Sequence, residues 1–367
     1  MSRKAKVIAF YLPQFYPVEI NDTLYGKGFT EWRNVASAKP LFPGHYQPHI
    51  PADLGFYDLR VAETREAQAQ LAKEYGIYGF CYWHYWLGNG VEFLDRPVKE
   101  IMQTGKPDFP FCLAWANHEW KSNSFFSRNT KVVIKQEYPG EDDYIKHFYS
   151  VLPCFKDKRY IKIDGKPVFM IYQPTANKDI PLFIKIWRRL AKENGLEDIY
   201  FIGHLNNDIQ GITRDDIWEV GVDAINTENL QTYWLKHCSN IKRKIIRYTE
   251  KLFNVPHRIP YKKAMKYFLS DEDADNDNIF QSVVPNWDNT PRRKYNGLVY
   301  TGSTPELFKE HLLKGLVMLK NRPEEKQIVF LKSWNEWAEG NYVEPDMKFG
   351  LGYLESIKEA LEEFDNI

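Results

Sequence analysis

The residues with the clearest chemical potential lie in one short segment, residues 332–345. It carries three carboxylates, Glu336, Glu339 and Glu344, among two tryptophans, a tyrosine and two asparagines. Indole rings can stack on the apolar faces of sugar rings, while carboxylates bind hydroxyl groups or transfer protons. Burial beside an indole would also raise the pKa of a carboxyl group, which keeps a general acid protonated. The segment therefore indicates carbohydrate chemistry.

A simpler explanation assigns the same residues to the amino terminus of a helix. In that arrangement Asn335, Glu336 and Glu339 would act as the cap and the first-turn charges. Capping does not require the flanking Trp334 and Trp337. We therefore favour the catalytic interpretation.

The composition narrows the classes of protein to consider. The chain has 367 residues, zero formal net charge and 43 % hydrophobic content. A neutral balance argues against nucleic acid as the main partner, because phosphate binding needs a basic footprint. Cys81 and Cys112 lie in apolar runs, and no cysteine has CxxC or zinc-ligand spacing. With no signal-like start and no membrane-length apolar run, we expect a cytoplasmic protein, with peripheral contact to the inner membrane left open.

Short apolar runs alternate with helical patterns along the chain. Their alternation predicts an α/β fold, a single (β/α)8 TIM barrel with long βα-loop insertions, as one domain over residues 1–367. A doubly wound open sheet is less favoured, because no glycine-rich phosphate loop follows the first run. Periodicity predicts helices over 59–75, 142–152, 182–193, 305–320 and 353–364. The predicted strands are 7–12, 77–83, 110–116, 168–172, 200–204, 223–227, 281–287 and 328–333.

Aromatic rings, amides and carboxylates recur where the predicted strands end. In a barrel of parallel strands those ends meet at one face, and that face carries the active site. A single aromatic cluster is more often core than ligand platform, but the repetition at most strand ends predicts a sugar-binding cleft. The predicted substrate-binding residues are Tyr11, Gln14, Trp32, Trp83, His84, Trp115, Asn117, His118, Asn206, Glu228, Trp287, Trp334, Asn335, Trp337 and Glu344.

Six motifs together resemble the WbsX family over nearly the whole chain. They are residues 9–15, 28–35, 39–48, 114–117, 287–293 and 334–345. One departure follows Asn117, where members of the family usually continue with Glu, Asn and Trp and this chain has His118, Glu119 and Trp120. The family is named for glycosyltransferases of surface-polysaccharide loci, and it resembles the glycoside hydrolase family 99 endo-α-mannosidases.

The resemblance implies a retaining endo-glycosidase that acts on a surface polysaccharide, with a role for each of two glutamates. Glu336 corresponds to the base that acts on the substrate 2-hydroxyl, and Glu339 corresponds to the general acid. The hydroxyl attacks the anomeric carbon to give a 1,2-anhydro sugar, which water opens with overall retention. The close spacing is compatible with this mechanism, because an enzyme nucleophile would need two carboxyls about 5–5.5 Å apart, generally from separate strands.

Two other functions compete with hydrolysis. A glycosyltransferase of lipopolysaccharide, O-antigen or capsule biosynthesis would need a nucleotide-sugar site. The Asp-x-Asp pattern of Asp271 and Asp273 could serve it, but we interpret this pattern as a solvated acidic loop. A carbohydrate-binding protein without catalysis would use the two glutamates only as hydroxyl ligands. His84, His118 and His204 have no HxH or HExxH spacing, so we expect neither a metal nor a cofactor.

A basic insertion is expected at about residues 236–278. Apolar residues recur within it at helical spacing and predict an amphipathic helix over 241–253. One interpretation packs the apolar stripe on the barrel and leaves the charges in water. The other is a peripheral contact with an anionic membrane or a lipid-linked glycan. The apolar residues are Ile241, Ile245, Tyr248 and Leu252.

Overall fold

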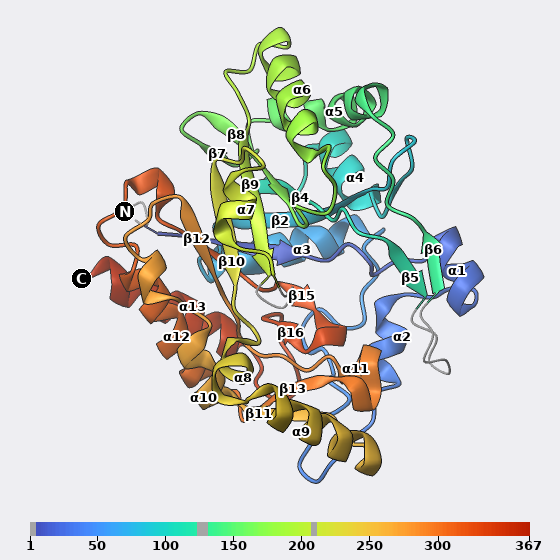
Figure 1. Cartoon of the computed structure of the whole chain (residues 1–367), viewed down its shortest axis with the longest axis vertical. Helices are drawn as coiled ribbons and strands as arrows, with labels where there is room; N and C mark the ends of the chain where they lie inside the picture. The colour runs from blue at the N-terminus through green and yellow to red at the C-terminus, as the bar shows by residue number, and fades with distance from the viewer. Residues whose placement is uncertain (1–4, 123–130, 207–210) are drawn as a thin grey trace.

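Eight parallel strands close into a barrel in the computed structural model, which describes residues 5–122, 131–206 and 211–367 (Figure 1). The last strand pairs with the first, with Lys6 opposite Ile328 and Ala9 opposite Leu331. The predicted (β/α)8 TIM barrel is therefore confirmed. Around the barrel the strands are β1 (Lys6–Tyr11), β2 (Gly79–Trp86), β4 (Phe111–Trp115), β8 (Lys166–Ile171), β9 (Tyr200–Asn206), β10 (Ala224–Glu228), β12 (Ile279–Val283) and β14 (Ile328–Leu331).

The ends of two strands, β12 and β2, differ most from those predicted. β12 ends at Val283, whereas the prediction extended it to residue 287. Pro285 follows, and because proline has no N–H for a ladder hydrogen bond, the strand stops before it. β2 continues to Trp86, where it pairs with the short antiparallel strand β3 (Glu92–Phe93).

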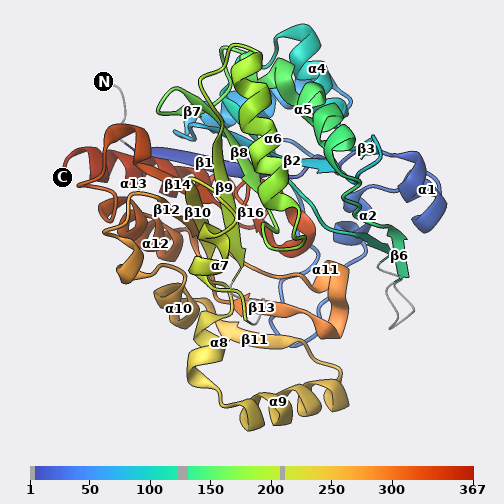
Figure 2. The same cartoon turned by 45° about the horizontal axis from the view of Figure 1, so that its top comes forward.

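Helices cover the outer side of the barrel (Figures 1 and 2). Those predicted from periodicity are α3 (Ala62–Glu74), α5 (Glu141–Lys156), α6 (Ile180–Glu193), α12 (Pro305–Val317) and α13 (Gly352–Asp365). In the described ranges, no helix combines the length and apolar character needed to cross a bilayer. The remaining helices near the strands are α1 (Glu19–Tyr25), α2 (Glu31–Ala36), α4 (Arg96–Thr104), α7 (Arg214–Trp218) and α11 (Thr290–Arg293).

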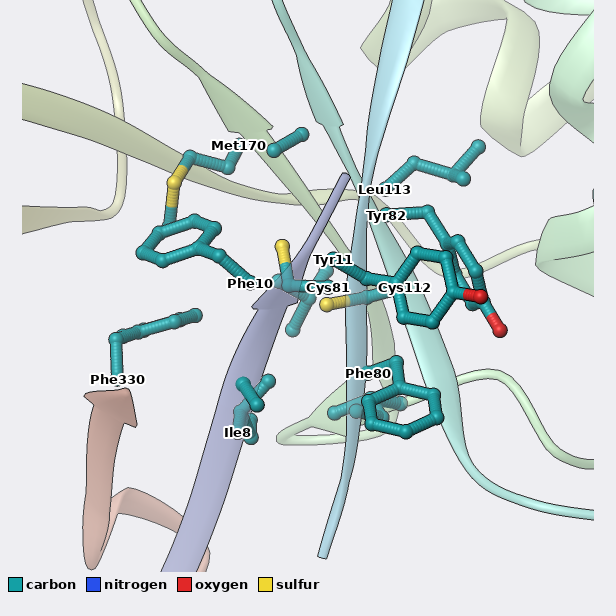
Figure 3. Close-up of a cluster of buried hydrophobic side chains, with 14 of the residues drawn as sticks. Ile8, Phe10, Tyr11, Phe80, Cys81, Tyr82, Cys112, Leu113, Met170 and Phe330 are labelled. Atoms are coloured by element: carbon teal, nitrogen blue, oxygen red, sulfur yellow. The ribbon is translucent and has the colours of Figure 1, made fainter. Parts of the chain in front are cut away.

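Side chains of the strands alternate between the barrel interior and the helical layer (Figure 3). Phe10 of β1 faces inward and stacks on Phe330 of β14, with ring centroids 5.4 Å apart. Its neighbour Tyr11 points the other way and meets Tyr82 of β2 at 4.5 Å. Since the period is two residues, the same parity decides which side chains at the carboxyl ends of the strands face the site.

The connection between β10 and β12 forms a small layer of its own. β11 (His257–Pro260) pairs in parallel with β13 (Leu298–Thr301), which follows β12 in the chain. Trp234, Tyr261 and Trp287 belong to a second buried cluster at this layer. The helices of the connection are α8 (Thr232–His237), α9 (Asn240–Phe253) and α10 (Tyr261–Ala264).

Helix α9 confirms the predicted helix, but the interpretation that packs its apolar stripe on the barrel is wrong. Ile241, Ile245, Tyr248 and Leu252 are 73 %, 57 %, 68 % and 62 % exposed. Ile246 is the residue that packs against the second buried cluster, because it lies on the opposite side of the helix. In both views α9 lies at the outer edge of the molecule (Figures 1 and 2).

Candidate active site

A cavity of about 360 Å³ opens at the carboxyl ends of the barrel strands. Its volume falls in the range of small-molecule sites, and its position is the one where (β/α)8 barrels carry their active sites. The lining mixes aromatic rings, amides and charged groups. It consists of Leu12, Gln14, Tyr25, Phe29, Glu31, Asn34, Trp83, Tyr85, Ala116, His118, Glu119, Trp120, Tyr172, Asn289, Arg292, Arg293, Lys332, Glu336 and Glu339.

One guanidinium joins three carboxylates in the wall of this cavity. Arg292 Nη2 lies 3.0 Å from Glu336 Oε2, and Nη1 lies 2.8 Å from Glu339 Oε1. Arg292 Nε lies 3.1 Å from Glu31 Oε2. Burial alone would lower the pKa of Arg292, but the three carboxylates raise it, so the cation persists. The guanidinium therefore holds Glu336 and Glu339 close together.

Asp288 fixes the loop that leads into α11. Its Oδ1 accepts from the backbone N–H of Thr290 at 3.0 Å and from the Thr290 hydroxyl at 2.6 Å. Its Oδ2 lies 2.7 Å from both Gln47 Nε2 and His45 Nε2. The backbone N–H of Asp288 donates to the carbonyl of Glu339 at 2.6 Å. One aspartate thus connects the first βα loop, α11 and the segment that carries the two glutamates.

An amide side chain anchors that segment where it leaves the barrel. Asn335 Oδ1 accepts from the N–H of Leu12 at 2.7 Å, and Asn335 Nδ2 donates to the carbonyl of Leu12 at 3.0 Å. Nδ2 also donates to the hydroxyl of Tyr57 at 3.2 Å. The pair of contacts to Leu12 reproduces the two hydrogen bonds of a strand neighbour, so Asn335 extends the closure of the barrel beyond β14.

The two glutamates then lie in a tight turn. β15 (Asn335–Glu336) leads into the 3₁₀ turn η5 (Trp337–Glu339) and returns through β16 (Asn341–Tyr342). Gly340, between η5 and β16, has φ +58°, and a Cβ there would stand 2.8 Å from the Cβ of Asp288. Glycine is required at this position, since it removes that clash and adopts the left-handed conformation at little cost.

Glu336 has an environment that changes its protonation. Burial, the largest cause, raises the pKa of Glu336 to about 7; Arg292 opposes this rise, and Glu339 and Glu31 add to it. A carboxyl with a pKa near neutrality can exchange a proton with a substrate hydroxyl at physiological pH. The geometry and protonation of Glu336 are thus compatible with a general base.

The indoles of the segment surround a different carboxylate. Glu344 Oε2 accepts from Trp337 Nε1 at 2.6 Å and from the Tyr57 hydroxyl at 2.9 Å. Gln68 Nε2 donates to Glu344 Oε1 at 2.6 Å. Burial raises the pKa of Glu344 to about 7 despite these donors. The prediction that Trp334 and Trp337 bind substrate is therefore corrected: both indoles are buried and lie outside the cavity lining.

A buried ion pair lies inside the barrel below the glutamates. Lys332 lines the cavity and pairs with Glu228, which is buried and outside the lining. His204 Nε2 lies 3.5 Å from Glu228 Oε2. Burial alone would lower the pKa of Lys332, but the charge of Glu228 raises it overall. The pair supplies a cation to the cavity, and Glu228 acts on the site through this cation.

Aromatic rings form the apolar part of the cavity wall. Trp83 stacks on Phe10 at 4.9 Å and meets the edge of Tyr172 at 5.3 Å. Across the wall, Tyr85 packs edge-on against Trp120 at 5.5 Å. Rings held by such contacts offer rigid apolar surface to a ligand. A sugar ring could stack on them while its hydroxyls meet the charged side.

Several predicted residues do reach this cavity. The lining contains Gln14, Trp83 and His118 from the predicted substrate-binding set. It also contains both predicted catalytic residues, Glu336 and Glu339. Asn206 lies beside the cavity, since its side chain hydrogen-bonds Tyr172.

The other predicted residues lie behind the lining, where they support it. Trp115 Nε1 donates to the carbonyl of Trp86 at 2.8 Å, because its strand position faces the helices. Asn117 exchanges two hydrogen bonds with the backbone of Gln173. The residues outside the lining are Tyr11, Trp32, His84, Trp115, Asn117, Glu228, Trp287, Trp334, Asn335, Trp337 and Glu344.

Sequence reasoning missed two residues at the centre of the site, Arg292 and Lys332. Lys332 lies two positions after the inward-facing Phe330, so strand parity could have placed it in the cavity. Arg292 belongs to the 287–293 motif, but sequence spacing alone does not predict which side chains a single arginine contacts. Tertiary structure alone brings Glu31 to it.

Metal ligands do not gather among the described residues, where no group of three or more His, Cys, Asp or Glu could hold an ion. His84 lies 2.8 Å from His147, on the helical side of the barrel. His204 contacts Asn226 at 2.7 Å inside the barrel. The histidines considered from sequence thus have separate environments.

The family described as Glycosyltransferase WbsX matches residues 7–357. The chain belongs to this family. The resemblance drawn from the sequence motifs is therefore confirmed.

Proteins named WxcX are relatives of this WbsX-family chain. WxcX from Xanthomonas campestris pv. campestris strain B100 is 32 % identical over 364 residues, which cover 97 % of this chain and 50 % of WxcX. WxcX from strain ATCC 33913 is 33 % identical over the same length and coverage. The chain thus spans about half the length of the curated relatives it matches.

Solved structures share the fold of this WbsX-family chain. A glycoside hydrolase-like protein superposes with a TM-score of 0.62 and 15 % identity, covering 98 % of this chain and 94 % of its own. The GH99 endo-alpha-mannosidase from Bacteroides thetaiotaomicron superposes with a TM-score of 0.59 and 15 % identity, covering 98 % of this chain and 97 % of its own. At this identity the likeness shows a common fold.

The amide anchor yields a stability prediction. Asn335→Ala removes three hydrogen bonds and leaves the buried backbone of Leu12 unpaired. We expect a loss of about 2–4 kcal/mol in the free energy of unfolding, measured by denaturant titration. Asn366→Ala, at an exposed position near the end of α13, should change it by less than about 0.5 kcal/mol. Equal effects of the two variants would contradict the anchoring role.

The environment of Glu336 yields a pH prediction. The native state binds the Glu336 proton more tightly than the unfolded chain, since its pKa rises from 4.5 to about 7. Wild type should therefore lose stability as pH rises through this window. Glu336→Gln cannot ionise, so relative to wild type it should gain up to about 3 kcal/mol across the window. A stability difference that stays constant from pH 4.5 to 7, followed by chemical denaturation, would refute the raised pKa.

Proposed function

We propose that this chain is a carbohydrate-active enzyme that cleaves glycosidic bonds of a surface polysaccharide or related glycan, as a retaining endo-glycosidase. The observation that carries the proposal is the clamp by Arg292 on Glu336 and Glu339 inside the barrel cavity. Two carboxylates held by one cation, beside aromatic walls, provide proton transfer and sugar stacking in one place. Membership of the WbsX family supports a glycan as the substrate.

The proposed reaction assigns one proton transfer to each glutamate. Glu336 takes the proton of the substrate 2-hydroxyl, whose oxygen attacks the anomeric carbon. Glu339 gives a proton to the departing glycosidic oxygen, and the bond to the leaving sugar breaks. Water then opens the 1,2-anhydro sugar at the anomeric carbon, with Glu339 taking its proton and Glu336 returning one to the 2-oxygen. Two inversions give overall retention.

The protonation of Glu336 supports its role in this scheme. General bases work best when their pKa lies near the working pH, and burial raises the pKa of Glu336 to about 7. Arg292 opposes that rise, so it keeps part of the Glu336 population ionised at neutral pH. Arg292 is thereby proposed as a positioning residue for both glutamates.

A glycosyltransferase is the second candidate, because the family description names that activity. In the same cavity a sugar hydroxyl could replace water in opening the anhydro sugar, which would give transfer. A nucleotide-sugar mechanism with an Asp-x-Asp metal site is less favoured. Asp273 forms an ion pair with Arg214 at 2.7 Å, and it precedes the amino end of β12, opposite the cavity. We therefore place hydrolysis first.

A product assay tests the reaction class. The protein is incubated with a panel of defined surface polysaccharides, and separately with nucleotide sugars and acceptors, and the products are followed by mass spectrometry. We expect release of oligosaccharide without any nucleotide. Product formation that requires a nucleotide sugar, is lost with a chelator and returns with Mn²⁺ would favour the transferase instead.

The proposed acid yields a leaving-group prediction. Glu339→Gln should slow cleavage of natural glycans by about 10²–10⁴-fold, because their poor leaving groups need a proton. Activated aryl glycosides should lose much less, since they depart without protonation. Glu119→Gln, a change at another carboxylate of the cavity lining, is the matched control and should affect both substrate types alike. Equal loss on both types for Glu339→Gln would disprove the acid role.

Two further readouts separate the alternatives for Glu336. A substrate without the 2-hydroxyl should be inert, and its turnover would eliminate the anhydro mechanism. A non-catalytic carbohydrate-binding protein would show no turnover in wild type, and Glu336→Gln would leave its glycan affinity intact.

A further inference from the structure

We propose that helix α9 docks the protein on an anionic lipid bilayer through its outward-facing apolar stripe. The stripe consists of Ile241, Ile245, Tyr248 and Leu252, and basic side chains flank it. The inference concerns a surface outside the cavity, so it stands or falls independently of the proposed reaction.

The helix is well formed although none of its residues is buried in the core. The Ser239 hydroxyl caps its amino end by accepting from the N–H of Lys242 at 3.3 Å, and Asn254 ends it in the left-handed conformation. No residue of α9 is buried. Helices of globular proteins normally turn their apolar stripe toward the core, so an exposed stripe needs another partner.

Contacts on the opposite side fix this orientation. Ile246 packs against the second buried cluster, and Glu250 Oε1 lies 2.5 Å from Nδ1 of His257 in β11. These residues hold the inner face of α9 to the protein. The stripe at positions i, i+4, i+7 and i+11 therefore faces away from the barrel.

The charges around the stripe indicate what covers it. Lys242, Lys244, Arg247 and Lys251 are exposed, and across the described ranges none of them forms an ion pair. Glu250, the acidic residue of this helix, already contacts His257. An interfacial helix has this design: apolar residues enter the lipid while lysines and arginines reach anionic headgroups.

The same charges argue against a second copy of the chain as the partner. Two stripes that met face to face would bring like-charged lysines and arginines together, at a cost to the contact. An anionic bilayer instead complements both the apolar and the basic part of the surface. The formal net charge of the whole chain is zero, so the attraction depends on this local patch.

The position of α9 gives the docking a consequence for the cavity. α9 contacts the short turn η3 (Lys294–Asn296). This turn directly follows α11, which carries Arg292. A bilayer held at α9 would therefore lie near a loop that forms the cavity wall, where a glycan attached to a lipid could be presented.

Vesicle flotation with the full chain tests the proposal. Vesicles of phosphatidylcholine with phosphatidylglycerol are compared with vesicles of phosphatidylcholine alone, at low and at moderate salt. We expect the protein to float with the anionic vesicles and to be released as salt rises, because screening weakens surface charge attraction. Protein that stays unbound at low salt would overturn the proposal.

Two variants locate the bound surface. Replacing Ile241, Ile245, Tyr248 and Leu252 by Ser should abolish flotation without unfolding the protein, because these side chains touch no core. Reversing the charges of Lys244, Arg247 and Lys251 to Glu should weaken binding by at least about 100-fold. The matched control reverses exposed Lys178, Lys185 and Lys192 near α6, and should bind as wild type does.

The remaining outcomes decide against a bilayer. Binding that survives the serine variant would mean that another surface contacts the vesicle. A dimer seen by light scattering in wild type, lost in the serine variant and not accompanied by flotation, would assign the stripe to a second copy. Equal loss in the α6 control would reduce the effect to net charge and overturn the role of α9.

Discussion

The guanidinium of Arg292 contacts carboxylates from two distant parts of the chain, and the arrangement of the cavity depends on these contacts. Glu31 comes from α2, Glu336 from β15 and Glu339 from η5. Without a cation these three carboxylates would repel one another, and the two buried ones, Glu31 and Glu336, would also lose their hydration. Burial costs several kcal/mol per unpaired charge. The loops can therefore converge only because the arginine lies between them.

A second constraint, centred on Asp288, sets the distances between these loops. Its carboxylate contacts His45 and Gln47 of the first βα loop, while its backbone N–H contacts the carbonyl of Glu339. Burial would raise the pKa of Asp288, but the hydrogen bonds to its carboxylate lower it overall, which keeps it an acceptor. Arg292 thus provides the positive charge between the carboxylates, and Asp288 fixes the positions of the loops that carry them. The requirement for glycine at Gly340 follows from the same close approach.

Much of the fold could be predicted from the sequence, because apolar runs and helical periodicity report burial directly. The end of β12 could not be predicted, since the strand pattern in the sequence continues past Pro285 to residue 287. At the site, the chemistry of Glu336 and Glu339 was readable, and both line the cavity. The sequence does not show whether an aromatic ring beside a carboxylate faces a substrate or packs in the core, so it predicts Trp334 and Trp337 as substrate-binding residues. Only the packing shows that both rings are in the core. For α9 the period was visible in the sequence, but the direction of its apolar side was not.

The anchor made by Asn335 has a consequence for how the turn beyond it can change. The carbonyl of Trp334 accepts a hydrogen bond from the N–H of Val343 at 3.0 Å. The turn that carries both glutamates therefore begins and ends at one point of the barrel rim. Because a side chain, and not the continuing backbone, completes the pairing with Leu12, the rim remains sealed whatever path residues 336–342 follow. Compact loops with adjoining ends tolerate changes of sequence and length better than the elements that hold them. In evolution the turn could therefore change in sequence or length while the barrel that holds it stays the same, and the site could acquire different chemistry.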